Sequence, residues 1–148
     1  MGRLVTIDGT GTERNRLRRT IAEALRLLGQ KAELDDEARD LTALIVFSLR
    51  QIAAGVETSA AAWEKRDYYM KADRFRREWA WVELSAGELE KILRQGRWAA
   101  LPAALARLLP RFSDIKLSKM TRTPDLWAGC YARLLLEDKP RAVAPSAP

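Results

Sequence analysis

The chain has 148 residues, long enough for one domain with its own apolar core, and its 26 Lys and Arg against 20 Asp and Glu give a net charge of +6. It contains no histidine and a single cysteine, Cys130. These counts exclude an internal disulfide, catalysis by a Ser/His or Cys/His pair, and zinc sites that need histidine or several cysteines.

No membrane or export segment is evident in the sequence. The main uncharged run, residues 41–49, lies between Asp40 and Arg50 and is far shorter than the roughly 20 residues of a membrane-spanning helix. The first residues lack the basic start, apolar run and small-residue cleavage site of a signal peptide. We therefore expect a cytoplasmic protein without a membrane partner.

The first helix is expected over residues 10–29. Thr10 and Glu13 match a capping box at its start, and Gly29 suits a left-handed cap at its end. Residues 1–9 are interpreted as a flexible arm. The outer face of the helix is basic, which suits either phosphate contacts or plain solvation. Its cations are Arg14, Arg16, Arg18, Arg19 and Arg26.

A hairpin of two helices, residues 36–54 and 59–84, is expected at the centre of the fold. Asp35 or Asp36 caps the first helix, whose middle, LTALIVFSL, is apolar nearly all round and so belongs in the interior. Gly55 ends this helix. The connection to the next helix is very short, which makes the two helices antiparallel neighbours.

The stretch from residue 63 to 81 has no glycine, proline or β-branched residue, which predicts an uninterrupted helix with two apolar faces. At 3.6 residues per turn, Tyr68 falls on the core face, while Trp63, Met70 and Trp81 share the opposite face. That second face must pack on another helix of the chain, a second subunit or a stacked ligand. We interpret these three residues as an interface.

Later elements are marked by their ends. Ser85 and Glu88 match a second capping box, for a helix that stops at Gly96. An Ala/Leu-rich helix over residues 98–109 follows, with Pro110 as its stop.

Residues 111–122 are expected to form a basic loop, after which a last helix begins near residue 123. Its inward residues are Trp127, Cys130, Tyr131 and Leu134. Residues 139–148, rich in Pro and Ala, are expected to be disordered. The predicted fold is an all-α antiparallel bundle of five to six helices, a single domain over residues 10–138.

Two acidic pairs occur at helical spacing. Glu37 with Asp40, and Glu64 with Asp67, each place two carboxylates on one helix face. Paired motifs of this kind resemble the magnesium sites of all-α nucleotide pyrophosphohydrolases. In the expected hairpin register, however, the two pairs lie about twelve residues, or about 18 Å, apart along the helices. They cannot share one ion.

The same register predicts ion pairs between the two hairpin helices. Asp40 comes opposite Arg74, and Glu37 comes opposite Arg76. Each pair would contribute about 0 to 1 kcal/mol if exposed.

A basic and aromatic set of residues suggests contact with nucleic acid. Arginine beside exposed aromatic rings can hold phosphates and stack on bases without reading sequence. The chain has no helix-turn-helix, zinc-finger, basic-zipper or RNA-binding sheet motif, so sequence-specific recognition is not expected. The candidate nucleic-acid-binding residues are Lys65, Arg66, Tyr69, Lys71, Arg74, Arg76, Arg77, Arg111, Lys116, Lys119 and Arg122.

The sequence favours a non-catalytic helical module, a small basic subunit of a larger assembly that contacts the nucleic-acid backbone. A homo-oligomeric helical bundle that binds no nucleic acid is the first alternative, and a magnesium-dependent all-α nucleotide hydrolase is the second. No catalytic residue, metal ligand, cofactor or small-molecule substrate is assigned. A protein partner or self-association is expected.

Overall fold

The computed structural model describes residues 2–137, with side chains from residue 9 onward, and this part is all-helical, with 78% helix and no strand. The predicted all-α class is confirmed. The tail expected to be disordered lies outside the described residues. The α-helices are α1 (Gly2–Gly29), α2 (Asp36–Glu64), α3 (Tyr69–Glu78), α4 (Ala80–Gln95), α5 (Leu101–Leu108) and α6 (Cys130–Leu136). Short 3-10 helices cover Trp98–Ala100, Leu109–Phe112 and Pro124–Leu126.

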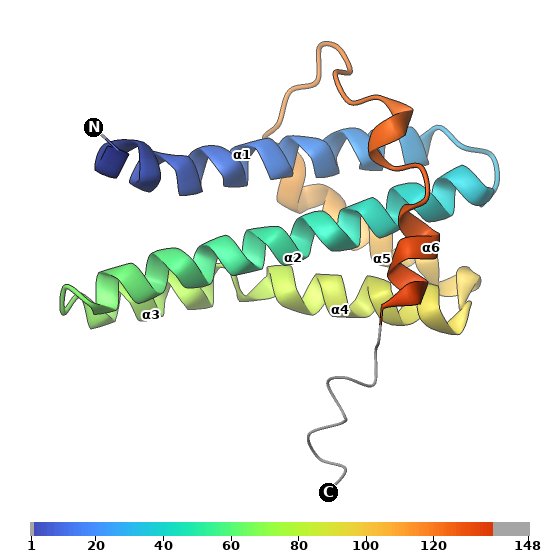
Figure 1. The fold of residues 1–148 in the computed structure, drawn as a ribbon. Coiled ribbons are helices and arrows are strands. Elements are labelled where there is room, and N and C mark those ends of the chain that lie inside the picture. Colours follow the sequence, from blue (N-terminus) through green and yellow to red (C-terminus); the bar gives the residue numbers. More distant parts are fainter. Residues whose placement is uncertain (1, 138–148) are drawn as a thin grey trace, which may run out of the picture.

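α2 lies at the centre of the fold, in contact with α1, α3, α4 and α6 (Figure 1). α1 runs antiparallel to it on one side, and α3 and α4 run antiparallel to it on the other (Figure 1). The apolar middle of α2 is buried as predicted, with Leu41, Ile45 and Leu49 all 0% exposed. By length and composition α2 could cross a membrane, but 56% of its most apolar window is buried within the protein. A central helix needs this apolar character for packing.

The start of α2 follows the expected capping chemistry. Oδ1 of Asp35 accepts a hydrogen bond of 2.8 Å from the backbone amide of Ala38, and Asp36 and Glu37 add negative charge to the first turn. A carboxylate at this position satisfies an amide that has no partner within the helix.

The expected end of this helix at Gly55 is wrong, because α2 continues to Glu64. Ile52, Val56 and Ala60 extend its buried stripe past the glycine, so packing outweighs the weak helix propensity of one residue. A Cβ added at Gly55 would lie 3.6 Å from Cγ2 of Thr10, so this face of α2 lies against α1.

The expected continuous helix over residues 59–84 is also wrong, since it is divided among α2, α3 and α4. Asp67 adopts a left-handed conformation, φ 65°. The amide of Tyr68 donates to the carbonyl of Trp63 at 2.9 Å, and the amide of Asp67 donates to that of Glu64 at 3.0 Å. This is the Schellman pattern of helix termination, here with aspartate where glycine is usual.

Three predicted helix starts are misplaced. The last helix, expected from near residue 123, begins only at Cys130, after a separate 3-10 helix over Pro124–Leu126. α1 begins at Gly2, so residues 2–9 belong to the helix and Thr10 is not its cap. Similarly, α4 begins at Ala80, which places Ser85 inside it, because Val82 and Ala86 continue one buried stripe across the supposed cap. A capping box requires an end of the backbone hydrogen-bond ladder, and none occurs at either site.

The predicted helix ends agree better with the structure. α1 ends at Gly29 as expected, although without the left-handed conformation, which among described glycines only Gly96 and Gly129 adopt. Gly96 ends α4 with φ 64°. In the last third, Trp127, Cys130 and Leu134 are buried as predicted. Burial raises the pKa of the Cys130 thiol, so it is an unreactive core group.

Candidate nucleic-acid interface

The turn between α2 and α3 exposes large aromatic and apolar side chains. Tyr68 is 52% exposed, Tyr69 59% and Met70 79%. We refer to residues 65–74, which contain this turn, as the tip. The sequence assigned Tyr68 to the core face of a continuous helix, and the turn at Asp67 moves it to the surface instead. Tyr68 is thus a candidate site residue that helical periodicity missed.

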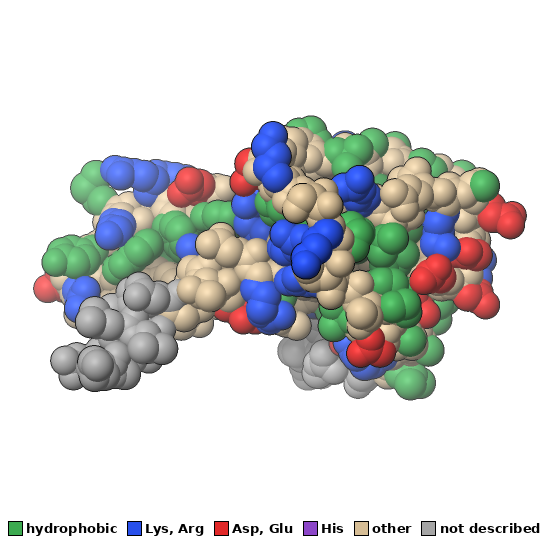
Figure 2. All heavy atoms as spheres, turned by 90° about the horizontal axis from the view of Figure 1, so that it is seen from above, with side chains coloured by type: hydrophobic (Ala, Val, Ile, Leu, Met, Phe, Trp, Pro, Cys, Tyr) green, Lys and Arg blue, Asp and Glu red, His purple; other side chains and the backbone are tan. Residues whose placement is uncertain are grey.

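The tip also carries cations without carboxylate partners. Lys65, Arg66, Lys71 and Arg74 are exposed, and among described residues none has an acidic group within ion-pair distance. The ammonium of Lys71 lies 4.5 Å from the centroid of the Trp63 ring. At the end of the molecule where α2 meets α3, Figure 2 shows basic and hydrophobic side chains next to one another. This arrangement suits an anionic ligand with flat apolar groups.

Arg76, predicted as a phosphate ligand, is instead bound within the protein. Its guanidinium donates to Glu57 at 2.8 and 2.9 Å and to Glu64 at 2.6 and 3.1 Å, which holds α3 against α2. These hydrogen bonds raise the pKa of Arg76 and lower the pKa of Glu64. Arg77 pairs with Asp73. Neither arginine is as available to a ligand as Lys65 or Arg74.

The ion pairs predicted between Asp40 and Arg74 and between Glu37 and Arg76 are wrong. Because α2 extends to Glu64, the point where the chain turns back lies about nine residues beyond Gly55, and the partners change accordingly.

The acidic pair on α2 fastens the C-terminal segment. Oε2 of Glu37 accepts from the indole N–H of Trp127 at 3.0 Å, and its Oε1 pairs with Lys31 at 2.8 Å. Both contacts lower the pKa of Glu37. Asp40 accepts from the backbone amides of Gly129 and Tyr131 at 3.2 and 2.9 Å. Across the described residues, no three potential ligands gather in a geometry that could hold a metal ion.

The three predicted interface residues do not share one helix face. Trp63 lies on α2, Met70 on α3 and Trp81 on α4. A chain of ring contacts, with centroids 4.9 to 6.3 Å apart, partly covers both tryptophans. It runs through Trp63, Phe75, Trp79, Trp81 and Phe112. Of the three predicted residues, Met70 has much the largest exposed fraction.

Residues 113–123 cross α1 and are called the crossing segment here (Figure 1). The remaining predicted basic residues lie on it or next to it: Arg111, Lys116, Lys119 and Arg122. Lys116 and Lys119 are exposed. Arg111 lies 4.6 Å from the Trp81 ring centroid. Arg122 is occupied, because its guanidinium donates to the carbonyl of Arg16 at 2.9 Å and to the hydroxyl of Thr20 at 3.0 Å. Figure 2 looks onto this side, where basic side chains gather near the middle of the molecule.

The basic strip of α1 mostly serves the fold. Arg18 binds Asp114 at 2.8 and 3.0 Å, while Arg19 and Arg26 donate to the carbonyls of Lys119 and Leu117 at 2.6 and 2.9 Å. The last two contacts satisfy backbone carbonyls of the crossing segment, which forms no helix over residues 113–123. The sequence predicts a phosphate-binding or solvated face here and gives no sign of this role in tertiary structure.

Comparisons with known proteins assign no family. The chain matches no family model, no curated protein and no solved structure.

Proposed function

We propose that the protein is a non-catalytic module that binds single-stranded nucleic acid at the tip, without sequence specificity. One observation carries the proposal. A single turn places Tyr68 and Tyr69, both more than half exposed, among four cations that have no carboxylate partner in the described structure. The arrangement resembles neither a catalytic centre nor a duplex-reading helix.

Each group of the tip has a distinct task in this proposal. Lys65, Arg66, Lys71 and Arg74 bind backbone phosphates, and the two tyrosine rings stack on bases. Stacking requires unpaired bases, since a duplex hides their faces, so single strands are the preferred ligand. With about four phosphates neutralised, the logarithm of the affinity should fall with the logarithm of the salt concentration with a slope near −3.

The wider setting is part of the same proposal. We take the fold to be an antiparallel bundle centred on α2, with the tip at its exposed end. Four phosphate contacts give modest affinity alone, which suits a small cytoplasmic subunit that gains avidity from a larger assembly.

Fluorescence anisotropy with labelled DNA and RNA oligonucleotides of about 15 nucleotides at about 50 mM salt tests the proposal. Replacing Tyr68 and Tyr69 together by alanine should weaken binding at least about tenfold, because each stacked base contributes about 1 to 3 kcal/mol. Arg74→Ala should reduce the salt slope by about 0.7, the contribution of one phosphate contact on a single strand.

Arg77→Ala is the matched control, because this arginine lies on the same helix but is paired with Asp73. It should change affinity less than Arg74→Ala does. Dissociation constants weaker than about 10⁻⁴ M at low salt, or tip variants that bind as well as the parent protein, would overturn the proposal.

Self-association is the second candidate, favoured by the 79% exposure of Met70 beside two exposed tyrosines. A second copy could cover this patch by an isologous contact. Size-exclusion chromatography with light scattering separates the two candidates. A dimer that Met70→Lys dissociates would support self-association, whereas a monomer that binds nucleic acid would support the first candidate.

A further inference from the structure

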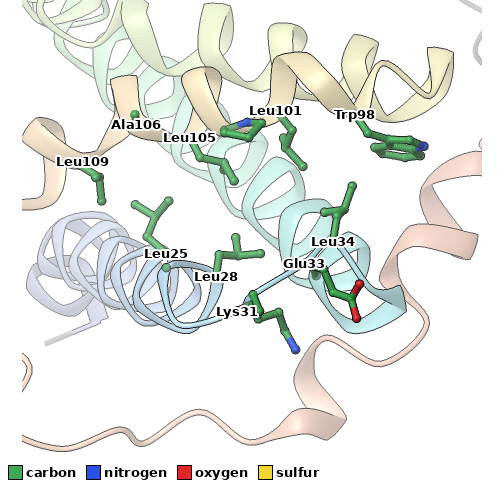
Figure 3. A pocket seen from close by; sticks show the side chains of 14 residues that line it. Leu25, Leu28, Lys31, Glu33, Leu34, Trp98, Leu101, Leu105, Ala106 and Leu109 are labelled. Carbon is green, nitrogen blue, oxygen red and sulfur yellow. The ribbon is translucent and has the colours of Figure 1, made fainter.

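A second feature, remote from the tip in sequence, is an apolar pocket of about 460 Å³. The end of α1, the turn after it, the start of α2 and α5 with its preceding 3-10 helix surround it (Figure 3). Leu25 and Leu28 enter from α1, Leu101 and Leu105 from α5, and Trp98 closes one end (Figure 3). The volume falls within the range of small-molecule sites, about 300 to 1,000 Å³.

The pocket leaves hydrocarbon in contact with water. Leu109 at its edge is 54% exposed, and Leu28, Leu34 and Leu105 are only partly buried. Covering such surface with an apolar ligand is favourable, because about 25 cal/mol is gained per square ångström removed from water.

The mouth of the pocket is acidic. Lys31 and Glu33 are the charged side chains of its lining, and they lie at the same end as Leu34 (Figure 3). The ammonium of Lys31 is already neutralised by Asp35 at 3.1 Å and Glu37 at 2.8 Å. Glu33 is exposed and has no ion pair or hydrogen bond from its side chain in the described structure. Asp35 and Glu37 lie outside the lining but neutralise its one ammonium, which leaves the carboxylate of Glu33 as the uncompensated charge of the lining.

We propose that this pocket binds a small hydrophobic amine, with its hydrocarbon part between α1 and α5 and its ammonium group beside Glu33. The apolar walls select the hydrocarbon, and the uncompensated carboxylate selects the cation. A preference for amines over carboxylates would be informative, because a chain with net charge +6 attracts anions non-specifically. A preference for amines must therefore come from the local field at the mouth.

Isothermal titration calorimetry with n-alkylamines measures the hydrocarbon contribution. From hexylamine through octylamine to decylamine, affinity should rise by up to about fourfold per methylene until the pocket is filled. Decylamine should bind more tightly than decanol, and decanol more tightly than decanoate. Binding of decanoate as tight as that of decylamine, or no binding of any probe at millimolar concentration, would overturn the proposal.

Two pairs of variants test where the ligand binds, and the first pair lies on α5. Ala106 is exposed and lines the pocket, so Ala106→Phe should fill it and weaken decylamine binding at least tenfold. Ala103, on the same helix and also exposed, lies outside the lining, so Ala103→Phe is the matched control and should bind as the parent protein does.

Glu33→Gln should weaken decylamine by about two- to fivefold and leave decanol unchanged, as expected for an exposed ion pair. Glu83→Gln, at an exposed glutamate without a described partner and outside the pocket, controls for the change in net charge. Equal effects of Ala106→Phe and Ala103→Phe, or of the two glutamate variants, would show binding elsewhere and refute the assignment. Nucleic-acid binding at the tip should be the same for all four variants, which keeps the two proposals separable.

Discussion

The carboxylate of Glu23 accepts hydrogen bonds from both the backbone amide and the hydroxyl of Thr121, at 3.0 and 2.9 Å, although the residues are 98 positions apart. The amide of Arg122 adds a contact at 2.9 Å and Arg19 one at 2.8 Å. Glu23 is 1% exposed. A buried carboxylate is tolerated only with such partners, and here they join the crossing segment to α1.

Glu23→Gln should lower the free energy of unfolding by about 2 to 4 kcal/mol, because the amide group of glutamine lacks the charge and turns one acceptor into a donor facing other donors. Urea unfolding followed by circular dichroism measures the change. Glu13→Gln is the control on the same helix, where the pair with Arg16 is half exposed. Its effect should stay within about 0.5 kcal/mol. Equal losses of unfolding free energy in the two variants would show that the hydrogen bonds of Glu23 do not stabilise the fold.

The same carboxylate should make stability depend on pH. Burial alone would raise the pKa of Glu23, but its hydrogen bonds from Arg122, Arg19 and Thr121 outweigh burial and lower it. A lowered pKa in the folded state contributes stability above the unfolded value of about 4.3 and loses it as the pH falls through the folded value. The difference in unfolding free energy between the parent protein and Glu23→Gln should therefore be constant above about pH 5 and shrink below about pH 4. A difference that grows on acidification would have the wrong sign.

Asp67 sits where a left-handed backbone is required, φ 65°. Asp67→Val should cost about 1 to 2 kcal/mol of unfolding free energy, because a β-branched side chain is strained in this region. Asp67→Gly should be neutral or stabilising by up to about 1 kcal/mol. Thermal unfolding distinguishes the two. Because Asp67→Gly also removes a negative charge from the tip, it should tighten binding of single-stranded nucleic acid, and weaker binding would count against the proposed interface.

Two glycines should respond oppositely to alanine. Gly55→Ala should stabilise by about 0.5 to 1 kcal/mol, since alanine is the better helix former and its Cβ would make an ordinary contact at 3.6 Å with Thr10. Gly96→Ala should destabilise by about 1 kcal/mol, because φ is 64° there. Chemical unfolding of both variants tests this contrast. Loss of stability in Gly55→Ala would mean that α1 approaches α2 more closely than the structure shows.

Several features of the fold could be predicted from the sequence because they depend on nearby residues. The cap at Asp35 and the stop at Gly96 follow from backbone hydrogen bonding within a few positions. The buried middle of α2 follows from its continuous apolar run. Of the six tip residues to which the proposal assigns a task, charge and aromatic content predict all but Tyr68.

Other features depend on contacts between distant segments. Nothing near Asp67 marks a helix end, so the break that exposes Tyr68 follows from the return of α3 along α2, held by Arg76 on Glu57 and Glu64. The same packing occupies the guanidinium of Arg76, which is therefore less available to a ligand at the candidate site.

The sequence by itself determined that the protein is helical, basic and without histidine chemistry, since these properties depend on composition and on periods of a few residues. Tertiary structure alone decided which cations are free. Arg122 shows no local sign of being occupied, because its partners Thr20 and Arg16 lie 102 and 106 positions away, on α1. Local patterns predict where charge lies along the chain, but only packing determines whether that charge is already neutralised.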